Sequence, residues 1–198
     1  MLEQLNQSLQ LIIEQTKHNF QFLGIILIVI WSVFFITRFI DNRLLLLGII
    51  PRKLRGLAGI FFSPFLHVNF NHIFFNSIPL IVLSNFILID GILYYSVVTV
   101  LIIFISGLAT WCFAKPGLHV GASGLITGYW GLLVSNIFQH GTLTTIMLGL
   151  ISLYYFAGIF LGVFPGKKGV SWEGHLFGLL AGFFTSYIMS NNLILFNH

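Results

Sequence analysis

Charged residues and cysteine are both scarce in this chain. Aspartate, glutamate, lysine and arginine make up 7% of the 198 residues, and Cys112 is the single cysteine. One cysteine within an apolar run excludes a disulfide framework and a cysteine-based metal site. The net charge of +4 comes from few residues, so it indicates charged loops and interfaces, not a surface that binds nucleic acid. We expect neither a metal nor another cofactor.

Apolar residues make up most of what remains. Hydrophobic residues account for 57% of the chain, and the mean hydropathy is +0.97. Apolar runs of about 20 residues are long enough to cross a bilayer core of about 30 Å as helices. The 22 phenylalanines and 20 glycines suit lipid-facing surfaces and close helix contacts. The composition therefore predicts an all-α, multi-pass integral membrane protein.

The apolar pattern predicts six membrane helices within a single membrane domain at residues 20–190. They fall at residues 20–37, 70–89, 93–113, 123–138, 143–163 and 172–189.

Three further segments lie outside these helices. Residues 1–19 carry leucine and isoleucine at helical spacing, which predicts a short amphipathic helix on the membrane surface. They are not a signal peptide, because Glu3 and Glu14 replace the basic n-region. Residues 41–66 combine short apolar runs with proline and basic residues, so we expect a loop partly embedded in one interface. This loop is either a folded connector or a wall beside a substrate path. Residues 191–198 form a short tail.

A serine between two glycines opens the fourth predicted helix. From Ser123 to Phe138 a helix is about 24 Å long, which is shorter than the bilayer core. Ser123 therefore lies below the membrane surface, at the floor of a cavity that water reaches, because irregular backbone at this depth must be buried in protein or hydrated. Gly121 and Gly124 permit a tight turn there. The alternative is that Ser123 only caps the helix.

Polar side chains also open the second predicted helix. His72 and Asn76 are four residues apart, so they share one face of a helix, and His67 precedes them. Polar groups inside a span usually face the protein interior or a water-filled cavity. A lone histidine here would be an interfacial anchor, but three polar groups together favour a site.

The fourth and sixth helices each carry a pair of glycines four residues apart. These pairs, Gly124–Gly128 and Gly178–Gly182, let two helix backbones approach closely. If the two stripes face each other, Ser123 and His175 lie at the same end of that contact. A hydroxyl and an imidazole within hydrogen-bond reach form a nucleophile and its base. Glu173 points in another direction, so we expect a Ser–His dyad without an orienting acid.

Together these motifs resemble the rhomboid family of intramembrane serine proteases. The resemblance covers residues 20–190, and its signature residues are His67, His72 and Asn76 in one run, Gly121, Ser123 and Gly124 in a second, and His175, Gly178 and Gly182 in a third. It implies a six-helix bundle in which Ser123 attacks a peptide carbonyl and His175 acts as the base. His72 and Asn76 would stabilise the oxyanion together with the Ser123 N–H. The implied substrates are single-span membrane proteins.

Two positions depart from common members of that family. Many relatives carry Trp-Arg in the first loop, where this chain has Leu54-Arg55. Some have a tyrosine one turn after the serine that stacks on the histidine, and here that residue is Thr127. Neither residue takes part in the chemistry. The departures therefore concern the anchoring of the loop and the support of the histidine.

The charge distribution conflicts with the family topology. Lys17 alone lies on the side of the N-terminus, and the other eight basic residues lie on the active-site side. The positive-inside rule would place the active site in the cytoplasm, whereas the family topology places it outside. We adopt the family topology and expect a multi-pass protein of the bacterial inner membrane.

Two other functions fit parts of the pattern. One is an inactive rhomboid-like protein that binds membrane proteins, although retention of all four candidate site residues argues against it. The other is a small transporter, but the sequence has no inverted repeat and no carboxylate in mid-span.

Overall fold

The computed structural model describes residues 2–165 and 171–191, and within them it contains helices and no strand. The six longest helices are α1 (Leu2–Phe39), α3 (Phe70–Leu88), α4 (Ile92–Phe113), α5 (Ser123–Gln139), α6 (Leu143–Phe156) and α8 (Trp172–Asn191). Five short helices connect them: η1 (Asn42–Leu47), η2 (Leu54–Gly56), α2 (Gly59–Phe62), η3 (Ser63–Phe65) and α7 (Gly158–Leu161).

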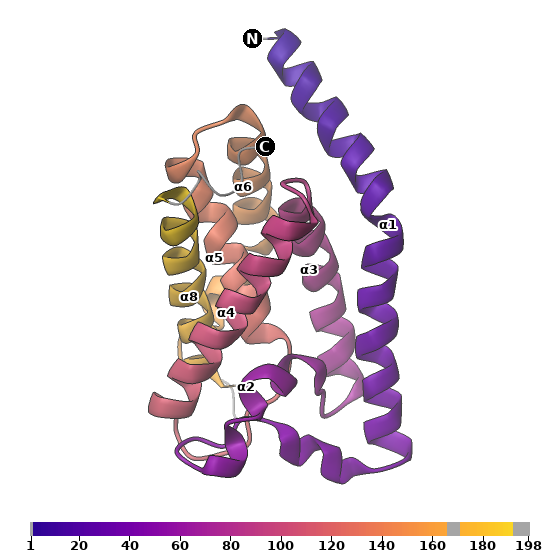
Figure 1. Ribbon diagram of the computed structural model, residues 1–198, viewed down its shortest axis with the longest axis vertical. Coiled ribbons are helices and arrows are strands. Elements are labelled where there is room, and N and C mark those ends of the chain that lie inside the picture. The colour runs from indigo at the N-terminus through magenta and orange to yellow at the C-terminus, as the bar shows by residue number, and fades with distance from the viewer. Residues whose placement is uncertain (1, 166–170, 192–198) are drawn as a thin grey trace.

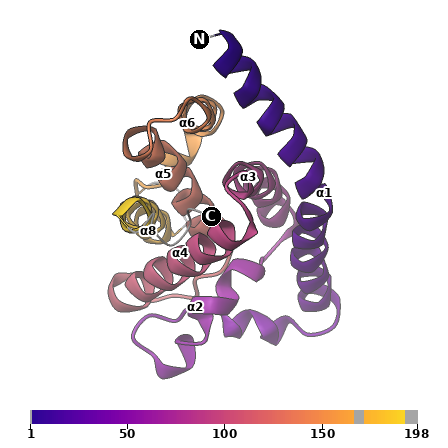
Figure 2. The same cartoon turned by 45° about the horizontal axis from the view of Figure 1, so that its top comes forward.

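The predicted all-α membrane bundle is confirmed. Helices α1, α3 and α4 are each long and apolar enough to cross a membrane. Helix α5 has 17 residues, and it lies inside the ring formed by α3, α4, α6 and α8 (Figure 2). Its Tyr129 and Leu132 are fully buried. The short helix that begins with Ser123 is therefore the centre of the bundle.

Helix α1 differs from the prediction of a separate surface segment over residues 1–19. It is one uninterrupted helix of 38 residues (Figure 1). Three polar residues in its first half, Ser8, Thr16 and Asn19, bond to neighbouring helices. Thr144 of α6 donates to the Ser8 hydroxyl at 3.1 Å, and Asn85 of α3 donates to the Thr16 hydroxyl at 2.8 Å. These bonds hold the N-terminal half of α1 against the bundle.

The fifth predicted helix is shorter than expected. Residues 143–163 do not form one helix, because α6 ends at Phe156 and the separate turn of α7 follows. Gly158 and Gly162 lower the helical propensity of this region. The chain can therefore bend, and the bend brings the Gly162 carbonyl against α8. Of the predicted tail at residues 191–198, all but Asn191 lies outside the described residues.

The two glycine stripes face each other, which is the condition under which Ser123 and His175 lie at the same end of the contact. Helices α5 and α8 form the most extensive helix pair among the described elements. A Cβ atom at Gly178 would overlap the Gly124 carbonyl, and one at Gly182 would overlap the Gly128 carbonyl. The two backbones are therefore in direct contact, and both helices begin at the same end of the bundle, which Figure 1 shows at the bottom.

The segment from Ile40 to Asn69, called the connector here, covers this same end. Its short helices lie below α4 and beside the start of α3 (Figure 1). Gly59 packs so closely on the Gly48–Ile49 backbone that a Cβ atom would overlap it. The predicted loop thus consists of short helices that pack on one another.

The stripe contact predicts unequal effects of two Gly→Ala substitutions. Gly182→Ala should lower the melting temperature in detergent, because overpacking against the Gly128 carbonyl costs about 1–3 kcal/mol. Gly24→Ala in α1 is the matched control, since its Cβ meets nothing within 4 Å. We expect that control to keep or slightly raise the melting temperature. Equal melting temperatures for the two variants would contradict the contact.

Candidate active site

A cleft of about 550 Å³ opens where α3, α5 and α8 begin. The four residues predicted to act in catalysis, Ser123, His175, His72 and Asn76, all line it. They come from three helices and lie up to 103 positions apart in the chain (His72 to His175). The fold thus gathers the sequence-predicted residues around one space, together with His119 and Ser171, which the sequence analysis did not select.

Ser123 is the first residue of α5, and its side chain is half-buried. No described residue forms a hydrogen bond with its hydroxyl, and the residue lines the cleft. The carbonyl of Ser123 accepts a bond from the Thr127 hydroxyl at 2.7 Å. Thr127 is therefore bonded back to its own helix, and it does not support His175 as the tyrosine of some relatives would. The free hydroxyl leaves Ser123 available to a ligand.

Gly121 brings the loop before Ser123 against α3. Its φ of +118° is a conformation that L side chains rarely adopt. A Cβ atom here would lie 2.5 Å from Nε2 of His72 and 3.6 Å from Nδ2 of Asn76. The Gly121 N–H donates to the Ser63 carbonyl at 2.9 Å. Glycine is thus required both by the backbone conformation and by the close approach of the His72 ring.

Asn76 directs an unused donor into this region. Its side chain is buried, and its Nδ2 has no hydrogen-bond partner among the described residues. An unsatisfied buried donor costs about 1–3 kcal/mol. Buried polar groups in native proteins are nearly always paired, so an exception calls for an explanation. The explanation here is that Asn76 Nδ2 is a donor for an acceptor group that only a ligand brings.

His72 and His67 pack ring against ring. The backbone N–H of His72 donates to the side chain of Asn69 at 2.9 Å, and this bond caps the start of α3. The His67 and His72 rings are 5.0 Å apart and nearly edge to face. His67 is 1% exposed and does not line the cleft, so its contact with the site is through His72.

His175 is held by a backbone carbonyl rather than by an acid. Its Nδ1 lies 2.8 Å from the Gly162 carbonyl oxygen. Because a carbonyl only accepts, Nδ1 carries the proton and Nε2 of the neutral ring keeps a free lone pair. Glu173 is buried but does not line the cleft. The sequence analysis missed Gly162, because no side chain marks the carbonyl that orients the ring.

The connector holds the loop between α4 and Ser123 at several points. The Arg52 guanidinium donates to the carbonyls of Cys112 and Ala114 at 3.0 and 2.9 Å. Ile49 and His119 exchange two backbone hydrogen bonds of 3.0 and 2.9 Å. The Ser63–Gly121 bond adds a third attachment. Among the described residues, Arg52 is thus the side chain that bonds the connector to the carbonyls at the end of α4, and no such bond comes from Leu54 or Arg55.

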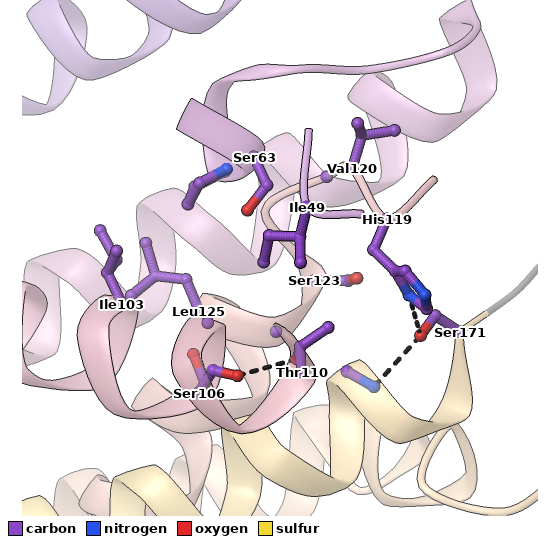
Figure 3. Close-up of a pocket in the computed structure, with 15 residues that line it drawn as sticks. Ile49, Ser63, Ile103, Ser106, Thr110, His119, Val120, Ser123, Leu125 and Ser171 are labelled. Carbon is purple, nitrogen blue, oxygen red and sulfur yellow. Dashed lines mark hydrogen bonds between the residues drawn. The ribbon is translucent and has the colours of Figure 1, made fainter. Parts of the chain in front are cut away.

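A second serine and histidine meet at the edge of the cleft. His119 Nδ1 lies 2.8 Å from the Ser171 hydroxyl, and the Gly174 N–H donates to that hydroxyl at 3.2 Å (Figure 3). Ser171 thus caps the start of α8. Figure 3 also shows the small cavity of about 60 Å³ beside Ser123, lined by Ser63, Ser106 and Thr110 among others. This volume is enough for a few water molecules.

No group of three or more His, Cys, Asp or Glu side chains suited to hold a metal ion occurs in the described part of the chain. A serine and a histidine in one cleft, together with an unpaired amide donor, are groups suited to acyl-transfer chemistry.

The helical bundle, with a cleft at one end, places this protein among the helical membrane proteins. Comparison with known proteins identifies the family. Residues 55–192 match the rhomboid domain family, so the chain belongs to the rhomboid family. An uncharacterized protein of Mycobacterium tuberculosis is 38% identical over 171 residues, which cover 81% of this chain and 71% of that protein. An uncharacterized protein of Mycobacterium leprae is 37% identical over 161 residues, which cover 76% and 62%.

The Gly162 contact generates a prediction about the tautomer of His175. A Cβ atom at Gly162 would lie 2.6 Å from His175 Nδ1, so Gly162→Ala should displace the ring and break its bond to the carbonyl. Nitrogen NMR of histidine-labelled protein in micelles should show the Nδ1–H tautomer in the wild type and its loss in the variant. Gly158→Ala is the matched control, because its Cβ meets nothing within 4 Å. An unchanged His175 signal in Gly162→Ala would refute the assignment.

Proposed function

We propose that this protein is an intramembrane serine endopeptidase that cleaves single-span membrane proteins with a Ser123–His175 dyad. The observation that carries the proposal is the shared cleft of Ser123, His175, His72 and Asn76. The family supports it, since rhomboid proteins are generally intramembrane serine proteases, although the family also has inactive members. The free hydroxyl of Ser123, the fixed tautomer of His175 and the unpaired Nδ2 of Asn76 each suit one part of the reaction.

The proposed reaction begins when the Ser123 oxygen attacks the carbonyl carbon of the scissile peptide. Nε2 of His175 takes the hydroxyl proton, while Nδ1–H stays bonded to the Gly162 carbonyl. The negative charge that forms on the carbonyl oxygen is stabilised by Nδ2 of Asn76, by His72 and by the Ser123 N–H. The peptide C–N bond then breaks, and the His175 imidazolium donates its proton to the leaving amine.

A water molecule completes the cycle. His175 again acts as the base, and water attacks the ester that joins the substrate to Ser123. The carboxyl product leaves, and the proton returns to the Ser123 oxygen. The rhomboid family implies that the helix of a substrate unwinds near the membrane surface to reach this cleft. It also implies that substrates with small or helix-breaking residues near the cleavage site are favoured.

We place the protein in the bacterial inner membrane, in keeping with the mycobacterial relatives. We place the cleft on the outer side, following the family topology. Two of the eight basic residues on that side, Arg43 and Arg52, have partners within the protein. Arg43 lies 3.0 Å from an oxygen of Asp41, and Arg52 donates to two carbonyls at the end of α4.

Substitution of the nucleophile tests the proposal. Ser123→Ala should abolish both cleavage of a single-span reporter in proteoliposomes and labelling by a fluorophosphonate, while the melting temperature stays unchanged because the hydroxyl has no protein partner. Ser96→Ala is the control, since that hydroxyl bonds only to a carbonyl of its own helix. Peptide mapping of the label distinguishes the two Ser–His pairs. Label on Ser171, or cleavage by purified Ser123→Ala protein, would overturn the assignment.

Two asparagines of α3 should respond in opposite ways. Asn76→Ala should lower kcat by up to about 10²–10³-fold with a smaller change in KM, because an oxyanion donor acts in the transition state. It should not lower the melting temperature, since Nδ2 has no partner to lose. Asn85→Ala should instead lower the melting temperature and leave kcat near normal, because Asn85 bonds to Thr16 and Asn19. Loss of stability with unchanged kcat in Asn76→Ala would remove Asn76 from the site.

A further inference from the structure

The structure assigns a positioning role to His119 and Ser171: their side-chain hydrogen bond is a latch that sets the distance between Ser123 and His175. This inference rests on the proposed function. The two latch residues occupy matching positions, because His119 lies four residues before Ser123 and Ser171 lies four residues before His175. The 2.8 Å bond between them therefore joins the segments that present the nucleophile and the base (Figure 3).

The partners of the latch define the direction of its hydrogen bond. His119 Nε2 lies 3.0 Å from the Lys115 carbonyl, which only accepts, so Nε2 carries the ring proton. Nδ1 of the neutral ring must then accept from the Ser171 hydroxyl. The oxygen of that hydroxyl accepts in turn from the Gly174 N–H at 3.2 Å. Every polar group of the latch is used, which fixes the ring and the serine in one arrangement.

The latch completes a clamp around the dyad. Deeper in the bundle than the cleft, α5 and α8 are held together by the backbone contact of Gly124 with Gly178. At the open end of the cleft, the backbone of the loop before Ser123 is bonded to the connector. Among the described residues, the latch is the side-chain hydrogen bond that joins this loop to the start of α8. Lys115 lies 5.9 Å from the Trp172 ring and adds a weaker cation–π contact at the same place. Ser123 and His175 lie between these two levels.

Loss of the latch should therefore affect reactivity and not only stability. Reacting groups must be held in a near-attack geometry, and a displacement of about 1 Å can reduce a rate by about 10²-fold. If Ser171 were only a helix cap and His119 only a packing residue, their removal would lower the melting temperature without changing the reactivity of folded protein. The positioning role predicts that Ser123 of a folded variant reacts more slowly with a small probe that makes no substrate contacts. The purely structural role predicts an unchanged rate.

The experiment measures the rate of fluorophosphonate labelling at Ser123 per folded full-length protein in detergent. The variants are His119→Phe, which keeps a ring but loses the acceptor, Ser171→Ala, and the double substitution. We expect each single variant to slow labelling by about 10- to 10²-fold. The double variant should be no slower than the slower single variant, because both changes remove the same bond.

Two further variants separate the latch from general stability. Ser171→Thr keeps the hydroxyl and should label within about threefold of wild type, an amount equivalent to less than 1 kcal/mol. Thr142→Ala removes the cap of α6, where the Thr142 hydroxyl accepts from the Thr145 N–H at 3.2 Å. It should lower the melting temperature without slowing labelling, and this control shows the effect of losing a cap far from the site.

Each result decides one of the two proposals. The latch is overturned if folded His119→Phe labels at the wild-type rate, or if the effects of the two substitutions add in the double variant. In either case, labelling of Ser123 in the wild-type protein leaves the proposed function standing. A Ser171→Thr variant as slow as Ser171→Ala also overturns the latch. Absence of labelling at Ser123 in the wild-type protein overturns the proposed function and the latch with it.

Discussion

The backbone contact between α5 and α8 is the constraint on which the rest of the site depends. Two helices in a membrane gain little from the hydrophobic effect, so close packing must hold them together. Here Gly178 lies on the Gly124 carbonyl and Gly182 on the Gly128 carbonyl, with no room for a Cβ atom. This contact fixes the two helix starts side by side. Ser123 and His175 face the same cleft because they stand at those starts.

The connector satisfies a second constraint that follows from the first. Helix α5 is short, and the chain that leads to it is irregular, so the backbone groups of that chain need partners outside a helix. The connector supplies partners for that backbone. Ile49 pairs with His119, the Ser63 carbonyl accepts from Gly121, and Arg52 donates to the carbonyls at the end of α4. A segment of short helices thus holds the loop that precedes Ser123.

The pattern of the sequence does not display which partners polar residues meet. Ser8, Thr16 and Asn19 give the first half of α1 the look of a surface helix, yet they bond to α3 and α6. The fifth helix is also shorter than its apolar run predicts. Its apolar run continues through Gly158, but the chain bends there and the Gly162 carbonyl turns towards His175. Hydropathy reports burial, and it does not report which neighbour a group meets.

The sequence by itself determined the membrane class, the helical segments, the family resemblance and the candidate residues Ser123, His175, His72 and Asn76. These carry signals that survive without a structure: apolar runs, glycines at helical spacing, and polar side chains within spans. The tertiary structure alone decided how the side chains are held. The partners of His175 and Arg52 are backbone carbonyls 13 to 62 positions away. Every residue has such a carbonyl, so only the folded chain shows which one is used.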